Sequence, residues 1–262
     1  MNGVTALVLT FNEAANIDRT LSRLSWTDRI VIVDSHSSDE TCAIAGRHPK
    51  VTVFQRAFTT HAEQWNFGLQ QTGITSDWIL ALDADFVLTA GFIREVETLT
   101  PAEGVDGYRA SFTYCVDGRP LWGAAYPPVT VLFRRERARY EQDGHTQRVR
   151  LTGAVAPLAG RILHDDRKPL AHWLSAQSRY MRLEAEKLST TPAAELGLAD
   201  RVRRLVVIAP PAMFFYCLMV RGGLLAGRAG LFYALQRATS ELILSLFLLQ
   251  RSLARTRPNG TP

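Results

Sequence analysis

The sequence predicts an α/β protein with a doubly wound, mostly parallel sheet. Short apolar runs of strand length recur through the first hundred residues, at 4–10, 29–34, 51–56 and 78–83. Segments with helical spacing or helix-start residues separate them. Strands this apolar, with helices between them, are typical of a parallel sheet that is covered on both faces.

The segments between these runs are predicted to be helices. After the first run, Asn12 can cap a helix whose apolar residues recur at helical spacing, at Ala14, Ile17, Leu21 and Leu24. Residues 37–40 (SSDE) follow the second run and combine a cap with an acidic first turn. Residues 61–71 form the helix before the fourth run.

The pattern changes after Gly91. A short helix at 92–99 leads to strand-like runs at 108–116 and 129–135, which the turn-like residues 117–120 separate. A Gly- and Arg-rich stretch, 140–168, precedes a helix from near Pro169 to about Leu188. We therefore expect a catalytic domain at 1–190, with a ligand-binding half at 1–100 and a second half at 101–190.

The C-terminal segment, 201–255, differs in kind. Residues 205–220 carry no charge but have two prolines in their middle, and residues 231–249 are amphipathic, with Arg237, Ser240, Glu241 and Ser245 on one stripe. Two such helices favour an interfacial or re-entrant membrane anchor. The alternative is that they pack as core helices against the catalytic domain or a second subunit.

The charge distribution supports the anchor. The chain has 262 residues and a net charge of +5. Residues 200–262 contain nine arginines and two acidic residues, so the basic surplus lies entirely in this segment. Arginines that flank apolar stretches favour an anionic membrane surface over nucleic acid. The three scattered cysteines indicate neither a disulfide framework nor a zinc site, and the first apolar run indicates a strand rather than a signal peptide.

Polar clusters follow the predicted strands. They are Thr10 to Glu13, Asp34 to Ser37, Arg56, and Asp83 to Asp85. Because ligands of open parallel sheets bind outside the carboxyl ends of the strands, we expect these clusters to share one edge. No glycine-rich phosphate loop follows the first strand, so the Asp83/Asp85 pair indicates Mg²⁺ or Mn²⁺ as the partner of a diphosphate.

Four segments, TALVLTFNEAANI, VIVDSHSSDET, EQWNFGL and DWILALDAD, resemble the motifs of family 2 glycosyltransferases with the GT-A fold, and above all the branch that builds the lipopolysaccharide inner core and cell-wall sugars. The resemblance covers residues 4–90 specifically and extends loosely to about 190. It implies that Asp85 ligates the metal, with Asp83 and His164 as further ligands. It also implies a nucleotide-sugar pocket formed by Thr10, Asn12, Glu13, Asp34, Ser35, Arg56, Gln64, Asn66, Asp83 and Ala84.

Family 2 enzymes invert the anomeric carbon, so a sugar hydroxyl acceptor needs a general base. The second half offers Asp143, which we favour, and His145, Asp165 or Asp166 as alternatives. An acceptor that is itself a lipid phosphate is already ionised and needs no base.

These observations predict an inverting hexosyltransferase that uses a nucleoside diphosphate sugar, such as a UDP-sugar, and a divalent metal. Its acceptor would be a lipid-linked or lipopolysaccharide-type saccharide at the cytoplasmic side of the bacterial inner membrane, where the protein is peripheral or monotopic. The alternatives are a nucleotidyltransferase and a non-catalytic membrane adaptor that binds nucleotide sugars.

Overall fold

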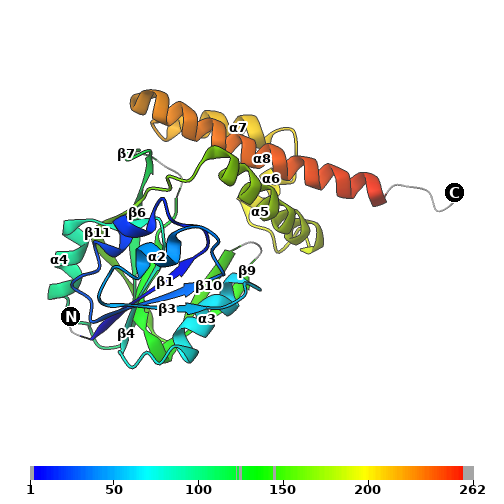
Figure 1. The fold of residues 1–262 in the computed structure, drawn as a ribbon. Helices are drawn as coiled ribbons and strands as arrows, with labels where there is room; N and C mark the ends of the chain where they lie inside the picture. The colour runs from blue at the N-terminus through cyan, green and yellow to red at the C-terminus, as the bar shows by residue number, and fades with distance from the viewer. Residues whose placement is uncertain (1–2, 122, 124–125, 144–145, 256–262) are drawn as a thin grey trace. The chain divides into compact units, whose positions relative to one another are not determined.

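The computed structural model describes residues 3–121, 123, 126–143 and 146–255, and it divides into two compact units (Figure 1). The first unit comprises Met1–Pro120 and Tyr126–Lys168, and the second comprises Leu121–Ala125 and Pro169–Pro262. The division falls after Lys168, before the boundary at residue 190 that the sequence pattern suggested.

The first unit is built on one large sheet. Its parallel part has the order β3 (Val51–Gln55), β2 (Arg29–Asp34), β1 (Val4–Thr10), β4 (Trp78–Asp83). The four expected strands are thus present, and the third ends one residue early. This order, with β1 between β2 and β4, confirms the predicted doubly wound α/β sheet.

The sheet continues with strands from the second half of the unit. β8 (Val129–Arg134) pairs antiparallel with β4 and with β6 (Val105–Val116), while β11 (Ala154–His164) runs parallel to β6. β5 (Phe86–Leu88) closes this edge antiparallel to β11, and β7 (Arg119–Pro120) pairs with the end of β6. The stretch at 140–168, where the sequence pattern defined no strand, also contributes to a separate hairpin of β9 (Ala138–Asp143) and β10 (Thr146–Leu151).

Helices cover both faces of the sheet, as its apolar strands require. One face packs Leu7, Val31 and Val33 against Trp65 and Leu69 of α3 (His61–Gln71). The other face packs Val8 and Ile32 in a cluster that includes residues of the helices α1 (Ile17–Leu21) and α4 (Ala90–Thr98). Asn16 rather than Asn12 precedes the first helix, and α2 (Thr41–Ala45) and the 3-10 turn η1 (Arg135–Arg137) complete the unit.

The second unit is helical. It contains α5 (Leu170–Thr190), α6 (Leu198–Arg203), α7 (Ala209–Phe215), a π-helical turn η2 (Tyr216–Val220), a 3-10 turn η3 (Gly223–Ala226) and the long α8 (Gly227–Arg255). Met181, Ala185 and Leu188 of α5 pack with Leu244 of α8. This shared core explains why α5 groups with the C-terminal helices.

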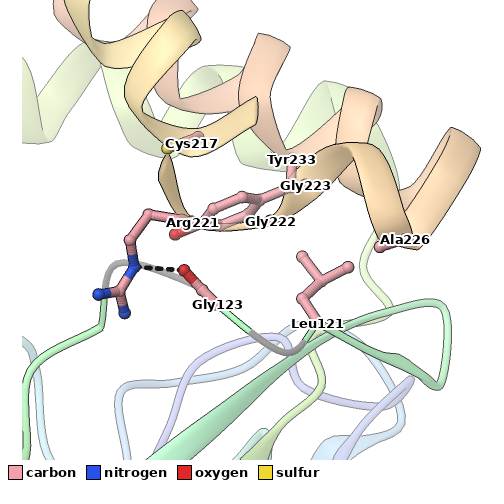
Figure 2. Close-up of a pocket in the computed structure, with 8 residues that line it drawn as sticks. All are labelled: Leu121, Gly123, Cys217, Arg221, Gly222, Gly223, Ala226 and Tyr233. Atoms are coloured by element: carbon pink, nitrogen blue, oxygen red, sulfur yellow. Dashed lines mark hydrogen bonds between the residues drawn. The ribbon is translucent and has the colours of Figure 1, made fainter. Parts of the chain in front are cut away.

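A sharp bend joins η2 to α8. Gly222 and Gly227 have positive φ angles of 70° and 57°, which side chains rarely tolerate. A Cβ atom on Gly230 would lie 1.9 Å from the Gly223 carbonyl oxygen, so only glycine permits this close approach. Figure 2 shows the inner side of the bend, where the Arg221 guanidinium donates to the Gly123 carbonyl beside Cys217 and Tyr233.

Within the described residues, no single helix has the length and apolar character needed to cross a membrane. The pair Ala209–Val220 and Gly223–Ala254 meets that requirement jointly, but it bends by 70° at the glycine turn.

Candidate functional site

The predicted site residues gather at the carboxyl ends of the parallel strands. In the strand register, Thr10 lies opposite Asp34, and Leu9, the residue before Thr10, lies opposite Asp83. His164 ends β11 and lies opposite Phe86, one residue after Asp85. The sheet therefore brings residues from the first, second and fourth strands and from position 164 to the same edge.

Asp34 organises the first part of this edge. Its carboxylate accepts hydrogen bonds from the Thr10 hydroxyl (2.8 Å), the Ser37 hydroxyl (2.5 Å) and the Ser37 backbone N–H (2.8 Å). Burial opposes ionisation of Asp34, but these donors outweigh it and hold the pKa of the carboxyl below its usual range. Because Asp34 is fully buried, it orients the Thr10 and Ser37 hydroxyls rather than facing solvent itself.

Asn12 joins the loops that follow β1 and β2. Its backbone N–H donates to the Ser37 hydroxyl (2.8 Å), and its side-chain oxygen accepts from the Ser38 N–H (2.8 Å). Asn12 and His36 have positive φ angles of 54° and 59°, the left-handed conformation that Asn and His adopt more readily than most residues. The two loops are thus held together by Asn12.

Ser35, Arg56 and Gln64 form a second polar group beside Asp34. The Gln64 amide donates to the Ser35 hydroxyl (3.0 Å) and the Arg56 carbonyl (3.1 Å), and its oxygen accepts from the Arg56 guanidinium. The Arg56 N–H donates to the Asp34 carbonyl (2.9 Å), which links the group to β2.

Asn66 does not join this group. Its amide donates to the Tyr140 carbonyl (2.9 Å) and accepts from the Tyr140 N–H (2.9 Å), like an additional strand residue beside β9. Asn66 therefore anchors the β9–β10 hairpin to α3, whereas the resemblance placed it beside the nucleotide.

The DxD segment lies after β4. The Asp85 carboxylate contacts His164 Nε2 at 3.0 Å, and the carbonyl of the buried Ala84 accepts from the Thr20 hydroxyl (2.7 Å). Burial and the neighbouring charge of Asp85 raise the pKa of Asp83 to about 6. For Asp85 itself, burial acts in the same direction, but the charge of His164 outweighs it and lowers the pKa.

Aromatic rings enclose His164. The rings of Tyr126, Tyr114 and Phe86 lie 4.8, 4.9 and 5.2 Å from the imidazole, centre to centre. Burial opposes protonation of His164, but Asp85 raises its pKa above the usual value. Its Nδ1 atom is buried without a hydrogen-bond partner. The DxD segment and the end of β11 thus offer two carboxylates and one imidazole, whose Nδ1 atom has no hydrogen-bond partner.

Among the described residues, no group of three or more His, Cys, Asp or Glu side chains is arranged to hold a metal ion. Of the expected ligands Asp85, Asp83 and His164, Asp85 and His164 are in direct contact. The charge of Asp85 contributes to the raised pKa of Asp83.

Glu13 faces the segment after β11. Its carboxylate lies 2.6 Å from the Lys168 ammonium and accepts from the Asn16 amide (2.8 Å). Burial opposes protonation of Lys168, but Glu13, Asp166 and Asp85 together raise its pKa. Glu13 thus holds the 164–168 segment at the sheet edge.

The candidate bases have different surroundings. Asp165 is buried, and its carboxylate accepts from Arg19 (2.6 Å), Arg167 (2.9 and 3.0 Å) and the Gly118 N–H (2.9 Å), so its oxygens are already engaged. Asp166 is half-buried and uses one oxygen for Asn16 (2.9 Å) and the Lys168 N–H (3.0 Å). Asp165 is a clamp between α1 and the 164–168 segment, and Asp166 is the freer carboxylate.

The favoured base, Asp143, ends β9 on the separate hairpin, where it pairs with Arg148 at 2.6 Å. The alternative His145 lies outside the described residues.

Three residues that contribute to this edge were not predicted from the sequence. Lys168 supplies a buried cation, Asn16 binds four groups around the 164–168 segment, and Tyr126 covers His164. Lys168 could have been predicted, because it ends the charged run HDDRK directly before Pro169. The sequence offers no comparable signal for Tyr126.

Comparisons with known proteins show the family of the chain. The model for "Glycosyl transferase family 2" matches residues 5–161, more than half of the chain. The lipopolysaccharide core biosynthesis glycosyltransferase LpsC of Rhizobium meliloti (strain 1021) is 26% identical over 273 residues, which cover 98% of this chain and 95% of LpsC. An uncharacterized glycosyltransferase of Rickettsia bellii (strain RML369-C) is 31% identical over 144 residues, or 52% of this chain and 48% of that protein.

Solved structures share the fold. The mannosyltransferase PcManGT from Pyrobaculum calidifontis, in complex with GDP-Man and Mn²⁺, superposes with a TM-score of 0.55 at 17% identity, covering 97% of this chain and 88% of that one. S. aureus TarS 1–349, in complex with UDP-GlcNAc, gives a TM-score of 0.50 at 14% identity over 99% and 93% of the two chains. At such low identity these likenesses establish the GT-A fold alone. The family match over residues 5–161 shows that the chain belongs to glycosyl transferase family 2.

Proposed function

We propose that this glycosyltransferase transfers a sugar, with inversion, from a nucleoside diphosphate sugar to a lipid-linked or lipopolysaccharide-type saccharide. The observation that carries the proposal is the shared strand edge, where the Asp34 cluster and the Asp83–Asp85 segment lie on either side of the end of β1. The near full-length similarity to LpsC, whose name assigns it to lipopolysaccharide core biosynthesis, supports this class of acceptor.

The nucleoside would bind over β1, β2 and β3. There the oriented hydroxyls of Thr10 and Ser37, the Ser35 hydroxyl and the Arg56–Gln64 pair offer donors and acceptors in fixed positions. Such groups match the N–H, carbonyl and hydroxyl groups of a base and ribose. PcManGT and TarS, which share the fold, were solved with GDP-Man and UDP-GlcNAc, so either nucleotide is compatible with it.

A divalent cation fits the Asp83–Asp85 segment. Burial and the charge of the neighbouring Asp85 carboxylate raise the pKa of Asp83, and a cation would offset that charge. Asp85 and His164 would hold Mn²⁺ or Mg²⁺, with Asp83 beside them, and such ions commonly take only one or two protein carboxylates and complete their coordination with phosphate oxygens and water. A bound ion would stabilise the negative charge on the departing nucleoside diphosphate.

The acceptor hydroxyl would meet its base from the second half of the first unit. We retain Asp143 as the base, and Asp166 is the alternative that lies at the strand edge next to Asn16 and Lys168. An acceptor phosphate would remove the need for either.

The C-terminal segment would hold the enzyme at the cytoplasmic side of the inner membrane. Its surplus of arginines matches an anionic lipid surface. A soluble donor then meets an acceptor that stays in the bilayer, and confinement to that surface raises the effective concentration of the enzyme.

The test is release of nucleoside diphosphate from a panel of UDP- and GDP-sugars with Mn²⁺ or Mg²⁺, together with thermal shift. We expect one sugar nucleotide to raise the melting temperature and to be turned over only with metal. A non-catalytic adaptor would give the shift without release. A nucleotidyltransferase would instead require a nucleoside triphosphate and a sugar phosphate. Either result would replace the proposal.

A further inference from the structure

The long helix α8 has its polar stripe inside and its apolar stripe outside. Ser240, Glu241 and Ser245, which the sequence places on one stripe, are each at most 3% exposed. The opposite stripe has an exposed fraction between 39% and 68% at Leu231, Phe232, Leu235, Leu242, Leu246, Leu249 and Leu253. A helix on the surface of a protein in water normally has the reverse arrangement.

The buried side of α8 combines apolar residues, among them Tyr233, Ala234 and Leu244, with polar side chains that meet charged partners. Arg203 of α6 lies 3.1 Å from Glu241, 2.9 Å from Glu184 of α5 and 3.5 Å from Asp200. The Ser245 hydroxyl donates to the Val206 carbonyl at 2.6 Å. These contacts join α5, α6 and α8 through ion pairs and hydrogen bonds. Such bonds can hold helices together in lipid, where apolar packing supplies no hydrophobic driving force.

A second exposed apolar surface lies around the glycine bend. Met219 and Val220 at the end of η2 are 62% and 71% exposed, and Leu224 and Leu225 of η3 are 57% and 89% exposed. Arg221 and Arg228 stand on either side of η3. Further exposed side chains precede it at Leu205, Val207, Ile208 and Phe215. Apolar side chains with flanking arginines are typical of segments that enter the headgroup and acyl region of an anionic membrane.

We propose that the second unit is immersed in a single leaflet of an anionic lipid bilayer. Acyl chains would cover the exposed apolar stripe of α8 listed above, here called the leucine stripe, and the end of the bend at Leu224 and Leu225. The proposal deepens the membrane association in the proposed function. The 70° bend between Ala209–Val220 and Gly223–Ala254 favours entry into one leaflet over a straight span. The unit is thus a monotopic anchor whose exposed apolar residues face lipid.

A second copy of this chain is the competing occupant of the leucine stripe. A dimer seam would account for α8 alone. It would leave the apolar residues of η2, η3 and the segment before α7 uncovered. The bilayer accounts for all of these residues together.

The experiment is flotation of the full-length protein with vesicles of phosphatidylethanolamine and phosphatidylglycerol. Leu242→Glu with Leu246→Glu places two charges on the stripe, and Gln236→Glu with Gln250→Glu places the same charges elsewhere on α8. Each leucine change should lower the partition coefficient about tenfold, the loss expected when one leucine side chain no longer leaves water. The glutamine pair should float nearly as the wild type does.

Leu235→Trp provides a probe that retains an apolar side chain. Vesicles with brominated acyl chains should quench the added indole fluorescence, and an unquenched indole would overturn the proposal even if the charged variants fail to fold. The proposal also fails if the wild-type protein does not float, if the leucine variant floats unchanged, or if ultracentrifugation shows a wild-type dimer that the leucine variant abolishes.

Donor hydrolysis separates this proposal from the proposed function. The leucine variant should retain metal-dependent hydrolysis of the donor in solution while losing transfer to a vesicle-borne acceptor. If no sugar nucleotide is hydrolysed by the wild type, the proposed function fails, whereas the flotation result still decides the membrane anchor.

Discussion

Asp85 Oδ2 and His164 Nε2 lie 3.0 Å apart, although 79 residues separate them in the chain. Asp85 follows the fourth strand of the sheet, and His164 ends the last long strand, β11, which pairs with β5 directly after Asp85. The pairing of β5 with β11 therefore creates this contact. It joins the half of the unit that we propose binds the nucleotide to the half that we propose supplies the acceptor base.

Replacement of Asp85 by Asn should abolish turnover. The change keeps the shape of the side chain but removes the negative charge on which a metal ligand depends, so we expect kcat to fall about 100-fold or more. The fall in kcat is measured as steady-state release of nucleoside diphosphate over a Mn²⁺ titration. Asp28→Asn, an exposed aspartate away from the strand edge, is the matched control, and an active Asp85→Asn protein would exclude the metal role.

Asp34→Asn should destabilise the protein in a pH-dependent way. Because the pKa of Asp34 is lowered in the folded state, its ionised form contributes stability at neutral pH. That contribution is lost as the pH falls through the folded-state pKa, below the ordinary value of about 4. Urea unfolding should give a loss of about 1–3 kcal/mol at pH 7, and this loss should shrink in acid. A loss that does not change with pH would argue against an ionised Asp34.

Lys168→Met should be strongly destabilising. The Glu13 and Lys168 side chains are only 12% and 15% exposed and lie 2.6 Å apart, so removal of the cation leaves a buried carboxylate without its counter-ion, at up to about 5 kcal/mol. Burial already raises the pKa of Glu13 to about 7, so protonation of Glu13 limits this cost at lower pH. Glu13→Gln added to Lys168→Met should recover part of that loss, which a double-mutant cycle measures. The exposed pair Glu141–Arg150 is the control, where the same cycle should give a coupling close to zero because solvent screens the two charges.

Asp143→Asn and Asp166→Asn should separate the candidate bases. If Asp143 removes the proton from the acceptor, its substitution lowers kcat for transfer about 100-fold or more and leaves donor binding unchanged. A near-normal rate would move the role to Asp166. If both variants transfer normally, His145 or an ionised acceptor phosphate takes their place.

Asp165→Asn is the companion to these two variants. Asp165 is clamped by Arg19, Arg167 and the Gly118 N–H. Its substitution should therefore lower the free energy of unfolding, while the folded fraction should keep most of its rate of sugar transfer. Parallel urea unfolding and single-turnover transfer measure the two effects. A normal stability with lost transfer would contradict the clamp.

The local sequence pattern was sufficient to predict the strands that end at the proposed nucleotide site. The apolar runs ending at Thr10, Asp34 and Asp83 are strands β1, β2 and β4, because a strand buried on both faces has to be apolar along its length. Parallel pairing then places their carboxyl ends at one edge. The cluster of Thr10, Asp34 and Ser35 could therefore be predicted without coordinates.

The orientation of individual side chains could not be predicted from the sequence. Asn66 and Gln64 are two residues apart on α3, yet Gln64 contacts Ser35 while Asn66 binds the Tyr140 backbone. Which side of a helix meets which neighbour depends on how the helix packs, and β9, to which Tyr140 belongs, was not recognised in the Gly- and Arg-rich stretch.

By itself, the sequence determined the parallel sheet, the polar edge and the two faces of the 231–249 helix, since each follows from residues close together in the chain. Only the tertiary structure decided that His164 meets Asp85, that Lys168 neutralises Glu13 and that the polar face of α8 is the buried one. These outcomes rest on contacts between distant segments. Periodicity shows that a helix has two faces, but the partners packed against it decide which face is covered.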